Sequence, residues 1–211
     1  MQHFLVFGDS LSWGIIPGTR RRLPFLERWP GVLETELVSR CFPVRITEDC
    51  LNGRRSVFED PYKPGRNGLL GLAQRIESAS PLDRILLMLG TNDFQFNHPF
   101  NSAYSSAQGI AALIQEIRRA PIEPGMSIPP ITIICPPAPR DDASQPMPKF
   151  VNATLRSAGL PAALNQVARD LDCDFFDASL IVKSSPIDGI HLDAPEHLTL
   201  GLALANYLLK R

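Results

Sequence analysis

Ile85-Leu-Leu-Met-Leu89, which ends at Gly90, is an unbroken apolar run of the kind found in central strands of parallel sheets. A strand of this kind is buried on both faces, so its apolar residues do not alternate with polar ones. Further strands are predicted on either side of it along the chain, at residues 4–7, 44–47, 131–135 and 174–176. The chain therefore predicts a sheet of five strands.

Segments with apolar residues at helical spacing separate these strands. Helices are predicted over residues 29–40, 69–78, 103–119, 152–171 and 198–209. Pro161 is expected to split or kink the fourth of them, because proline disrupts a helix interior. Strands that alternate with helices predict a parallel sheet covered on both faces, a three-layer α/β sandwich. No internal repeat or linker is visible, so we expect one domain over residues 1–211.

The composition excludes several classes of partner. The net charge is −1, whereas proteins that bind nucleic acids or membrane surfaces usually carry a basic excess. No apolar run approaches the ~18 residues that span a bilayer, and the first residues do not resemble a signal peptide. The four cysteines are far apart and do not have the spacing of zinc ligands. We therefore expect a cytoplasmic protein with free thiols and without nucleic-acid or membrane partners.

Four short polar motifs each follow a different predicted strand. They are Gly8-Asp-Ser-Leu11, Asn52-Gly53, Gly90-Thr-Asn-Asp93 and Asp188-Gly-Ile-His191. The carboxyl ends of parallel strands meet at one edge of the sheet, where such sheets bind ligands. Taken singly, each motif also fits a turn or a helix cap. Their occurrence together on one edge indicates a functional site.

The last motif has the spacing of a catalytic Asp–His pair. Asp188 precedes His191 by three residues, so both side chains can lie on the same side of a turn. An aspartate in that position can hold the imidazole in the tautomer that accepts a proton from a serine, here Ser10. Asp9 and Asp93 are interpreted as structural residues of their loops.

These residues resemble the four blocks of the SGNH hydrolases, also called the GDSL esterase family, which are named for their catalytic Ser, Gly, Asn and His. The matching residues, Ser10, Gly53, Asn92 and His191, span most of the chain. The segments 8–14, 48–54 and 88–93 are similar to bacterial arylesterases and acyltransferases of this family. The resemblance implies a flavodoxin-like sheet of five parallel strands.

The resemblance also implies a serine esterase that acts on short-chain acyl or aryl esters, small-molecule substrates, with acyl transfer as a second activity. Ser10 attacks the carbonyl, His191 takes its proton and Asp188 orients the imidazole. The oxyanion is held by the backbone N–H groups of Ser10 and Gly53 and by the Asn92 amide. No metal or cofactor is expected, and the rate should rise with pH as the histidine base loses its proton.

Several features leave the substrate open. Leu11, Trp13, Phe94 and Ile190 are expected to line the acyl pocket, with packing in the core as the alternative. An arginine-rich stretch at residues 20–22, and Arg55, where the family commonly has a small hydroxyl residue, are departures that are expected to reshape the pocket. The proline-rich segment 136–148 is interpreted as a substrate-covering loop or as a plain surface connection.

Alternative functions remain at this point. A deacetylase of O-acetylated sugars and a thioesterase fit the same triad. A metal-dependent phosphoesterase would use Asp9, Asp93, Asp188 and His191 as ligands. A non-catalytic binding module is a further alternative, because a fold does not determine a function. The oligomeric state, a homo-oligomer included, is also open.

Overall fold

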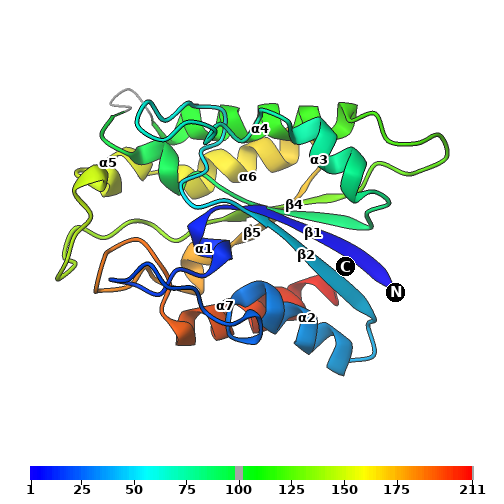
Figure 1. Ribbon diagram of the computed structural model, residues 1–211, viewed down its shortest axis with the longest axis horizontal. Coiled ribbons are helices and arrows are strands. Elements are labelled where there is room, and N and C mark those ends of the chain that lie inside the picture. The colour runs from blue at the N-terminus through cyan, green and yellow to red at the C-terminus, as the bar shows by residue number, and fades with distance from the viewer. Residues whose placement is uncertain (98–101, 211) are drawn as a thin grey trace.

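The computed structural model describes residues 1–97 and 102–210, and in it a parallel sheet lies between two layers of helices (Figure 1). The order in the sheet is β2-β1-β3-β4-β5, and every neighbouring pair is parallel. This order reverses direction between β1 and β3, and open α/β sheets bind ligands at such a switch point. The strands are β1 Gln2–Gly8, β2 Val44–Cys50, β3 Arg84–Met88, β4 Ile131–Cys135 and β5 Asp174–Asp177.

The strand β1 illustrates why both faces of the sheet carry helices. Phe4 and Val6 pack into the apolar cluster on one face, and Leu5 and Phe7 pack into the cluster on the other. All four side chains are almost fully buried. Because successive side chains of a strand point to opposite faces, an apolar run of this kind needs cover on both sides.

The helices form two layers around the sheet (Figure 1). Helices α2 Trp29–Ser39 and α7 Ala194–Leu208 cover one face, and α3 Leu72–Ala79, α4 Ala103–Arg119 and α6 Leu160–Asp170 cover the other. Two short helices, α1 Ser10–Trp13 and α5 Ala153–Ser157, lie at the carboxyl ends of the strands. The 3-10 turns are η1 Phe25–Glu27, η2 Thr91–Phe94, η3 Pro148–Phe150 and η4 Ala178–Leu180.

The three-layer α/β architecture and the five parallel strands are as predicted, but the element bounds differ in places. The helix predicted over residues 152–171 is two helices, α5 and α6. Pro161 lies in the first turn of α6, where a missing N–H costs no hydrogen bond, so it begins a new helix instead of interrupting one. Strand β2 runs three residues further than predicted, to Cys50, because it pairs with β1 along its whole length.

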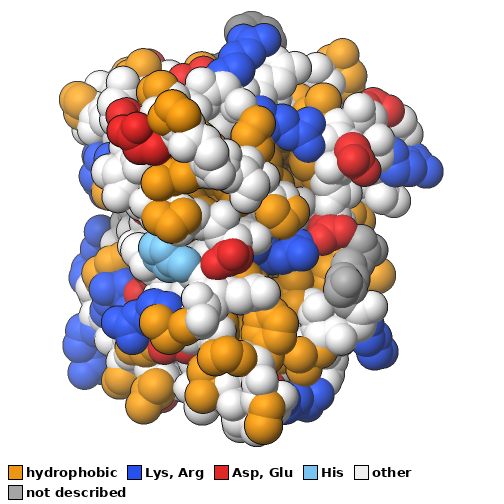
Figure 2. Space-filling view, turned by 90° about the vertical axis from the view of Figure 1, so that its right-hand side faces the viewer, with side chains coloured by type: hydrophobic (Ala, Val, Ile, Leu, Met, Phe, Trp, Pro, Cys, Tyr) orange, Lys and Arg blue, Asp and Glu red, His pale blue; other side chains and the backbone are white. Residues whose placement is uncertain are grey.

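The opposite end of the molecule, at the amino-terminal ends of the strands, has a mixed surface. Figure 2 shows acidic, basic and hydrophobic side chains interspersed there. Within residues 1–97 and 102–210, no helix has both the length and the apolar character that crossing a bilayer requires. The four cysteines are free, as predicted, and Cys41 is exposed.

Candidate active site

Ser10 lies directly after β1, at the first position of the short helix α1. The side chain of Asp9 caps this helix, because its Oδ1 accepts the backbone N–H of Leu11 at 2.9 Å. The cap fixes the turn that follows the strand and places the Ser10 hydroxyl at the carboxyl edge of the sheet. Ser10 is only 6% exposed, so its hydroxyl is reached through a narrow pocket.

The structure brings Ser10, His191 and Asp188 together from opposite ends of the chain. His191 Nε2 is 3.1 Å from Ser10 Oγ, and His191 Nδ1 is 2.7 Å from Asp188 Oδ2. All three side chains are buried. With the proton on Nδ1 held by the carboxylate, Nε2 is free to accept a proton from the serine. The arrangement is that of a serine nucleophile, a base and a carboxylate that orients the base.

The turn at 188–191 is built to hold this geometry. Asp188 Oδ1 accepts the backbone N–H groups of Ile190 and His191, each at 3.0 Å. Burial by itself raises the pKa of Asp188, but these hydrogen bonds and the His191 side chain lower it well below its ordinary value. Gly189 has a φ of +77°, and a Cβ there would lie 2.5 Å from the Arg140 carbonyl oxygen. Only glycine fits this turn without displacing the backbone of residue 140.

Two residues that line the pocket have a backbone N–H without an acceptor in the described part of the chain. They are Ser10 and Gly53, which line the same pocket as His191. Gly53 follows β2 and has a φ of +85°, a conformation that suits glycine. Backbone donors that converge beside a nucleophile can stabilise a developing oxyanion.

The Asn92 side chain is the third donor in this pocket, and its orientation is held on both sides. Its Nδ2 donates to Asp9 Oδ2 at 2.9 Å, and its Oδ1 accepts the Gln95 amide at 2.8 Å. The Gln95 Oε1 in turn accepts the Arg55 guanidinium at 3.0 Å. One N–H of the Asn92 amide remains for a ligand. A chain of polar side chains therefore fixes the direction of that N–H.

Asp9 and Asp93 are buried in their loops, as the structural interpretation expected. Burial raises the pKa of each to about 6, although hydrogen bonds oppose the shift. The Asp93 carboxylate accepts the Ser56 backbone N–H, the Ser56 hydroxyl and the Ser106 hydroxyl at 2.6–2.9 Å. These contacts join the loop after β2 to the loop after β3 and to helix α4. Asp93 therefore holds the two loops that carry Gly53 and Asn92.

Arg55 does not reach the pocket. Its side chain is fully buried and donates to the Glu59 carbonyl, Gln95 and Asn97 at 2.6–3.0 Å. An arginine in place of a small hydroxyl residue at position 55 therefore does not change the pocket lining. It instead fixes the orientation of Gln95. Arg20 does line the pocket.

The other predicted substrate contacts lie in different places. Ile190 lines the pocket with Ser10 and His191. Leu11 is buried in the core beneath α1, and Phe94 is buried in the core on the opposite face of the sheet. Trp13 is covered by the Arg22 guanidinium, 4.7 Å from the ring centre. Three of the four predicted side chains are therefore outside the pocket lining, because local packing and a cation cover them.

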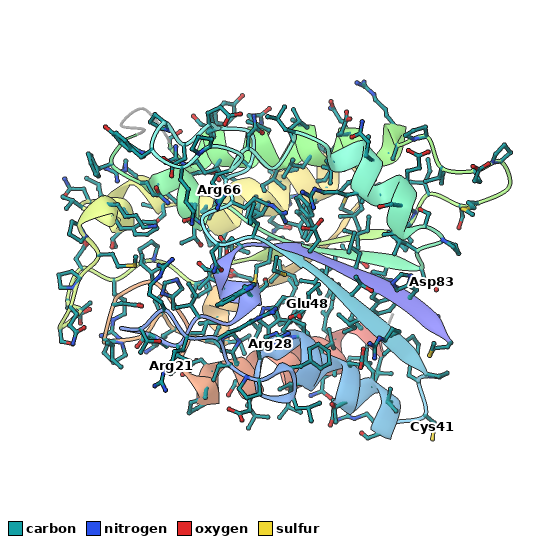
Figure 3. The ribbon with its side chains drawn as sticks, viewed as in Figure 1. Arg21, Arg28, Cys41, Glu48, Arg66 and Asp83 are labelled. Carbon is teal, nitrogen blue, oxygen red and sulfur yellow. The ribbon has the colours of Figure 1, made fainter. Side chains whose placement is uncertain are left out.

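Two segments that sequence reasoning left undecided close around the site. Gly18 N–H donates to Asp188 Oδ2 at 3.2 Å, which ties the loop after α1 to the triad. The ion pair of Arg28 with Glu48 links the end of this loop to β2 (Figure 3). The proline-rich segment donates from Arg140 N–H to the Gly189 carbonyl at 2.8 Å. Side chains at its end complete the pocket: Met147, Lys149 and Phe150.

The carboxylates do not form the metal site that the phosphoesterase alternative needs. In the described ranges, no three His, Cys, Asp or Glu side chains are placed so that they could hold a metal ion. Asp93 is bound to Ser56 and Ser106, and Asp188 is bound to His191. These two carboxylates therefore accept hydrogen bonds within the protein and are not arranged as metal ligands.

Comparisons with known proteins identify a family and several similar structures. The model of the GDSL-like lipase/acylhydrolase family matches residues 6–201. A carbohydrate acetylesterase family member from Sinorhizobium meliloti has a similar structure, with 31% identity, a TM-score of 0.91 and coverage of 100% of this chain and 98% of that one. The native aryl esterase of M. smegmatis is also similar, with 27% identity, a TM-score of 0.90 and coverage of 100% and 99%. A search of the curated proteins finds no match.

Proposed function

The chain belongs to the GDSL-like lipase/acylhydrolase family, and we propose that it hydrolyses short-chain acyl or aryl esters through an acyl-enzyme on Ser10. The family and the similar esterase structures make the protein a carboxylic ester hydrolase. The observation that carries the assignment of residues is the chain of hydrogen-bonding contacts from Asp188 to His191 to Ser10, at 2.7 and 3.1 Å.

The reaction begins with the attack of Ser10 Oγ on the ester carbonyl. His191 Nε2 takes the hydroxyl proton as the new C–O bond forms, and Asp188 stabilises the imidazolium. The negative charge that develops on the carbonyl oxygen is held by the N–H groups of Ser10 and Gly53 and by the Asn92 amide. These donors are already oriented before substrate binds, so little reorganisation is needed at the transition state.

Collapse of the tetrahedral intermediate releases the alcohol and leaves the acyl group on Ser10. His191 returns the proton to the leaving oxygen. It then takes a proton from a water molecule that attacks the acyl-enzyme, and a second tetrahedral intermediate releases the acid. An alcohol that enters in place of this water would receive the acyl group, so hydrolysis and transfer share one intermediate.

The size of the pocket supports a short acyl group. The pocket beside Ser10 has a volume of about 40 Å³, and its apolar lining includes Ile15, Phe150 and Ile190. A pocket this small favours acetyl esters over esters of long acyl chains.

Removal of an acetyl group from a sugar is the second candidate. Its support is the similarity to a carbohydrate acetylesterase family member, which at 31% identity covers the whole chain. A second carbohydrate acetylesterase from the same organism is 28% identical with a TM-score of 0.90. The two candidates share the acetyl group and differ in the alcohol, so an acetylated sugar and an aryl acetate separate them.

The proposal is tested with p-nitrophenyl esters of increasing acyl length. The wild type is compared with Ser10→Ala, and each is assayed with and without EDTA. Activity that falls with acyl length, is lost in Ser10→Ala and is unchanged by EDTA is the expected result. Full activity in Ser10→Ala, or loss only with EDTA, would contradict the proposal.

A further inference from the structure

Positively charged side chains surround the mouth of the pocket that holds Ser10. Arg20, Lys63 and Lys149 all line it. Arg20 comes from the segment after α1, Lys63 from the loop between β2 and α3, and Lys149 from η3. Because three distant segments each supply one cation, the charge arises only when the chain folds and is not visible as a basic run in the sequence.

Lys63 and Arg66 bind the peptide group between Asn52 and Gly53. Lys63 Nζ and Arg66 Nε both donate to the Asn52 carbonyl, at 3.3 and 3.0 Å. A Cβ on Gly53 would lie 3.8 Å from Arg66 Cδ and 4.0 Å from Lys63 Nζ. Figure 3 shows Arg66 on this loop, at the same end of the sheet as α1. A ligand group next to the Cα of Gly53 would therefore lie near the Lys63 ammonium group.

The cations of the pocket outnumber its acids. Among residues 1–97 and 102–210, no ion pair involves Arg20, Lys63 or Lys149. Asp60 is the one carboxylate among the described lining residues, and it lies 3.6 Å from the buried guanidinium of Arg55. Arginines outside the pocket that have a carboxylate partner within 4 Å are Arg22, Arg28, Arg40, Arg45, Arg54, Arg75, Arg84 and Arg140. In the pocket, three cations share one lining carboxylate, and that carboxylate already pairs with Arg55.

The positive charges around the pocket repel one another, and burial and this repulsion both lower the pKa values of the two lysines. Burial lowers the pKa of Lys63, and the neighbouring charges of Arg66 and Arg20 lower it further. Burial also lowers the pKa of Lys149, and the charge of Lys63 adds to this effect. The charge of Asp60 acts in the opposite direction on both lysines without cancelling the shifts. A concave site lined by charges of one sign attracts counter-ions, and a bound anion relieves the repulsion between them.

We infer that this pocket is selective for esters that carry an anionic group, such as a carboxylate, within a few bonds of the scissile carbonyl. Lys63, Lys149 and Arg20 would bind that group while the Gly53 N–H binds the oxyanion. The inference rests on the proposed esterase function and narrows its substrate class. The protein as a whole has a net charge of −1, so the attraction is confined to the pocket.

Two matched pairs of esters test the inference. In the first pair the anion is on the alcohol half, as meta-acetoxybenzoate against meta-acetoxybenzamide. In the second it is on the acyl half, as monomethyl succinate against methyl butyrate. In at least one pair, the one whose anionic group can reach the lysines, kcat/KM should be about tenfold higher for the anionic ester than for the neutral ester. Added salt should reduce this preference. The pair that shows the preference identifies the half that carries the anion.

Charge-neutralising variants connect the preference to the pocket. Lys63→Gln and Lys149→Gln should each reduce the ratio of kcat/KM for the anionic over the neutral ester by roughly 3–10-fold. Lys210→Gln is the matched control, because Lys210 is exposed and does not line the pocket. It should leave the ratio as in the wild type. The ratio is insensitive to a general loss of folded enzyme, since both esters are measured on the same sample.

The inference is overturned if neither pair shows a preference for the anionic ester, or if the lysine variants leave the ratio unchanged. Failure of the underlying function is a different result. In that case the wild type would hydrolyse the neutral esters no faster than Ser10→Ala. Ser10-dependent hydrolysis of the neutral esters with no anionic preference would overturn the inference alone.

Discussion

The side-chain amide of Gln95 donates a hydrogen bond of 2.8 Å to Oδ1 of Asn92, and this bond decides which end of the Asn92 amide faces the pocket. With Oδ1 bound to Gln95, the amide nitrogen is directed at Asp9 and at the space beside Ser10. Gln95 touches neither the serine nor the pocket, and it acts only through Asn92. It is a positioning residue, with consequences that kinetics can separate.

Asn92→Ala should lower kcat roughly 10²–10³-fold, because one oxyanion donor is lost. Gln95→Glu should lower kcat about tenfold with little change in KM, since a carboxylate cannot donate to Asn92 Oδ1 and the amide is then held only by its bond to Asp9. Steady-state kinetics with p-nitrophenyl acetate measures both effects. In the Asn92→Ala background, Gln95→Glu should add almost nothing. A full tenfold further loss in the double variant would contradict the positioning role.

Asp9→Asn tests the other side of the same amide. Burial raises the pKa of Asp9 to about 6, so the carboxylate is ionised at pH ~8 and mostly protonated at pH ~5. The ionised form accepts the Asn92 amide, whereas an asparagine side chain competes with it as a donor. The wild type should exceed the variant about tenfold in kcat at pH ~8, and the difference should shrink at pH ~5. A wild-type to variant ratio that does not change with pH would contradict this role.

Asp93→Ala should destabilise the fold. The substitution leaves two hydroxyls and the Ser56 N–H without their acceptor in a buried site. The expected loss in the free energy of unfolding is about 2–4 kcal/mol, measured by urea denaturation. Asp141→Ala is the control, because Asp141 is exposed, and it should change stability by less than ~0.5 kcal/mol. Equal stability of the two variants would show that Asp93 does not hold the loops together.

His197 should make the fold sensitive to acid. Burial, followed by the charge of Arg28, lowers the pKa of His197 from 6.5 to about 3. Between these values the unfolded chain binds a proton that the folded protein does not, so stability falls as the pH drops below 6.5. The carboxyl groups of Asp9 and Asp93, whose pKa values are raised to about 6, act in the opposite direction below pH 6.

The comparison of wild type with His197→Gln isolates the histidine from those carboxyl groups. Glutamine retains an acceptor for the Trp29 backbone N–H that His197 Nδ1 now accepts at 3.2 Å. Between pH ~7 and ~5 the wild type should lose up to about 2 kcal/mol more stability than the variant. Denaturant unfolding at the two pH values provides the measurement. Parallel losses in the two proteins would contradict a neutral buried His197.

The sheet and the placement of the four candidate-site motifs could be predicted because both depend on local patterns. The apolar runs at β3 and β4 have no exposed face, and only a central parallel strand gives that pattern. Ser10, Gly53, Asn92 and the turn at residue 188 all follow strands, so a parallel sheet brings them to one edge. The closeness of Ser10, Gly53 and Asn92 then follows from the strand order β2-β1-β3. The turn at residue 188 follows β5 at the far edge of the sheet, so the chain must return across the sheet to bring His191 to Ser10.

The pocket walls could not be predicted in the same way. Leu11 and Phe94 are neighbours of motif residues in sequence, but their side chains point into the core on opposite faces of the sheet. Lys63 and Lys149 have no local signal, because long connections bring them to the site. The contact of Gly18 with Asp188 spans 170 residues. Such contacts depend on the path that the loops take over the site. The spacing of apolar residues in the sequence does not determine that path.

The most direct test of the account is to trap the acyl-enzyme. The wild type is mixed with p-nitrophenyl acetate, quenched in acid before the acyl group is hydrolysed, digested and examined by mass spectrometry. The account predicts an acetyl group on the peptide that contains Ser10, at the Ser10 side chain, and none in Ser10→Ala. Release of p-nitrophenol at the wild-type rate by Ser10→Ala, or an acetyl group on a different residue that forms and decays at the rate of turnover, would contradict it.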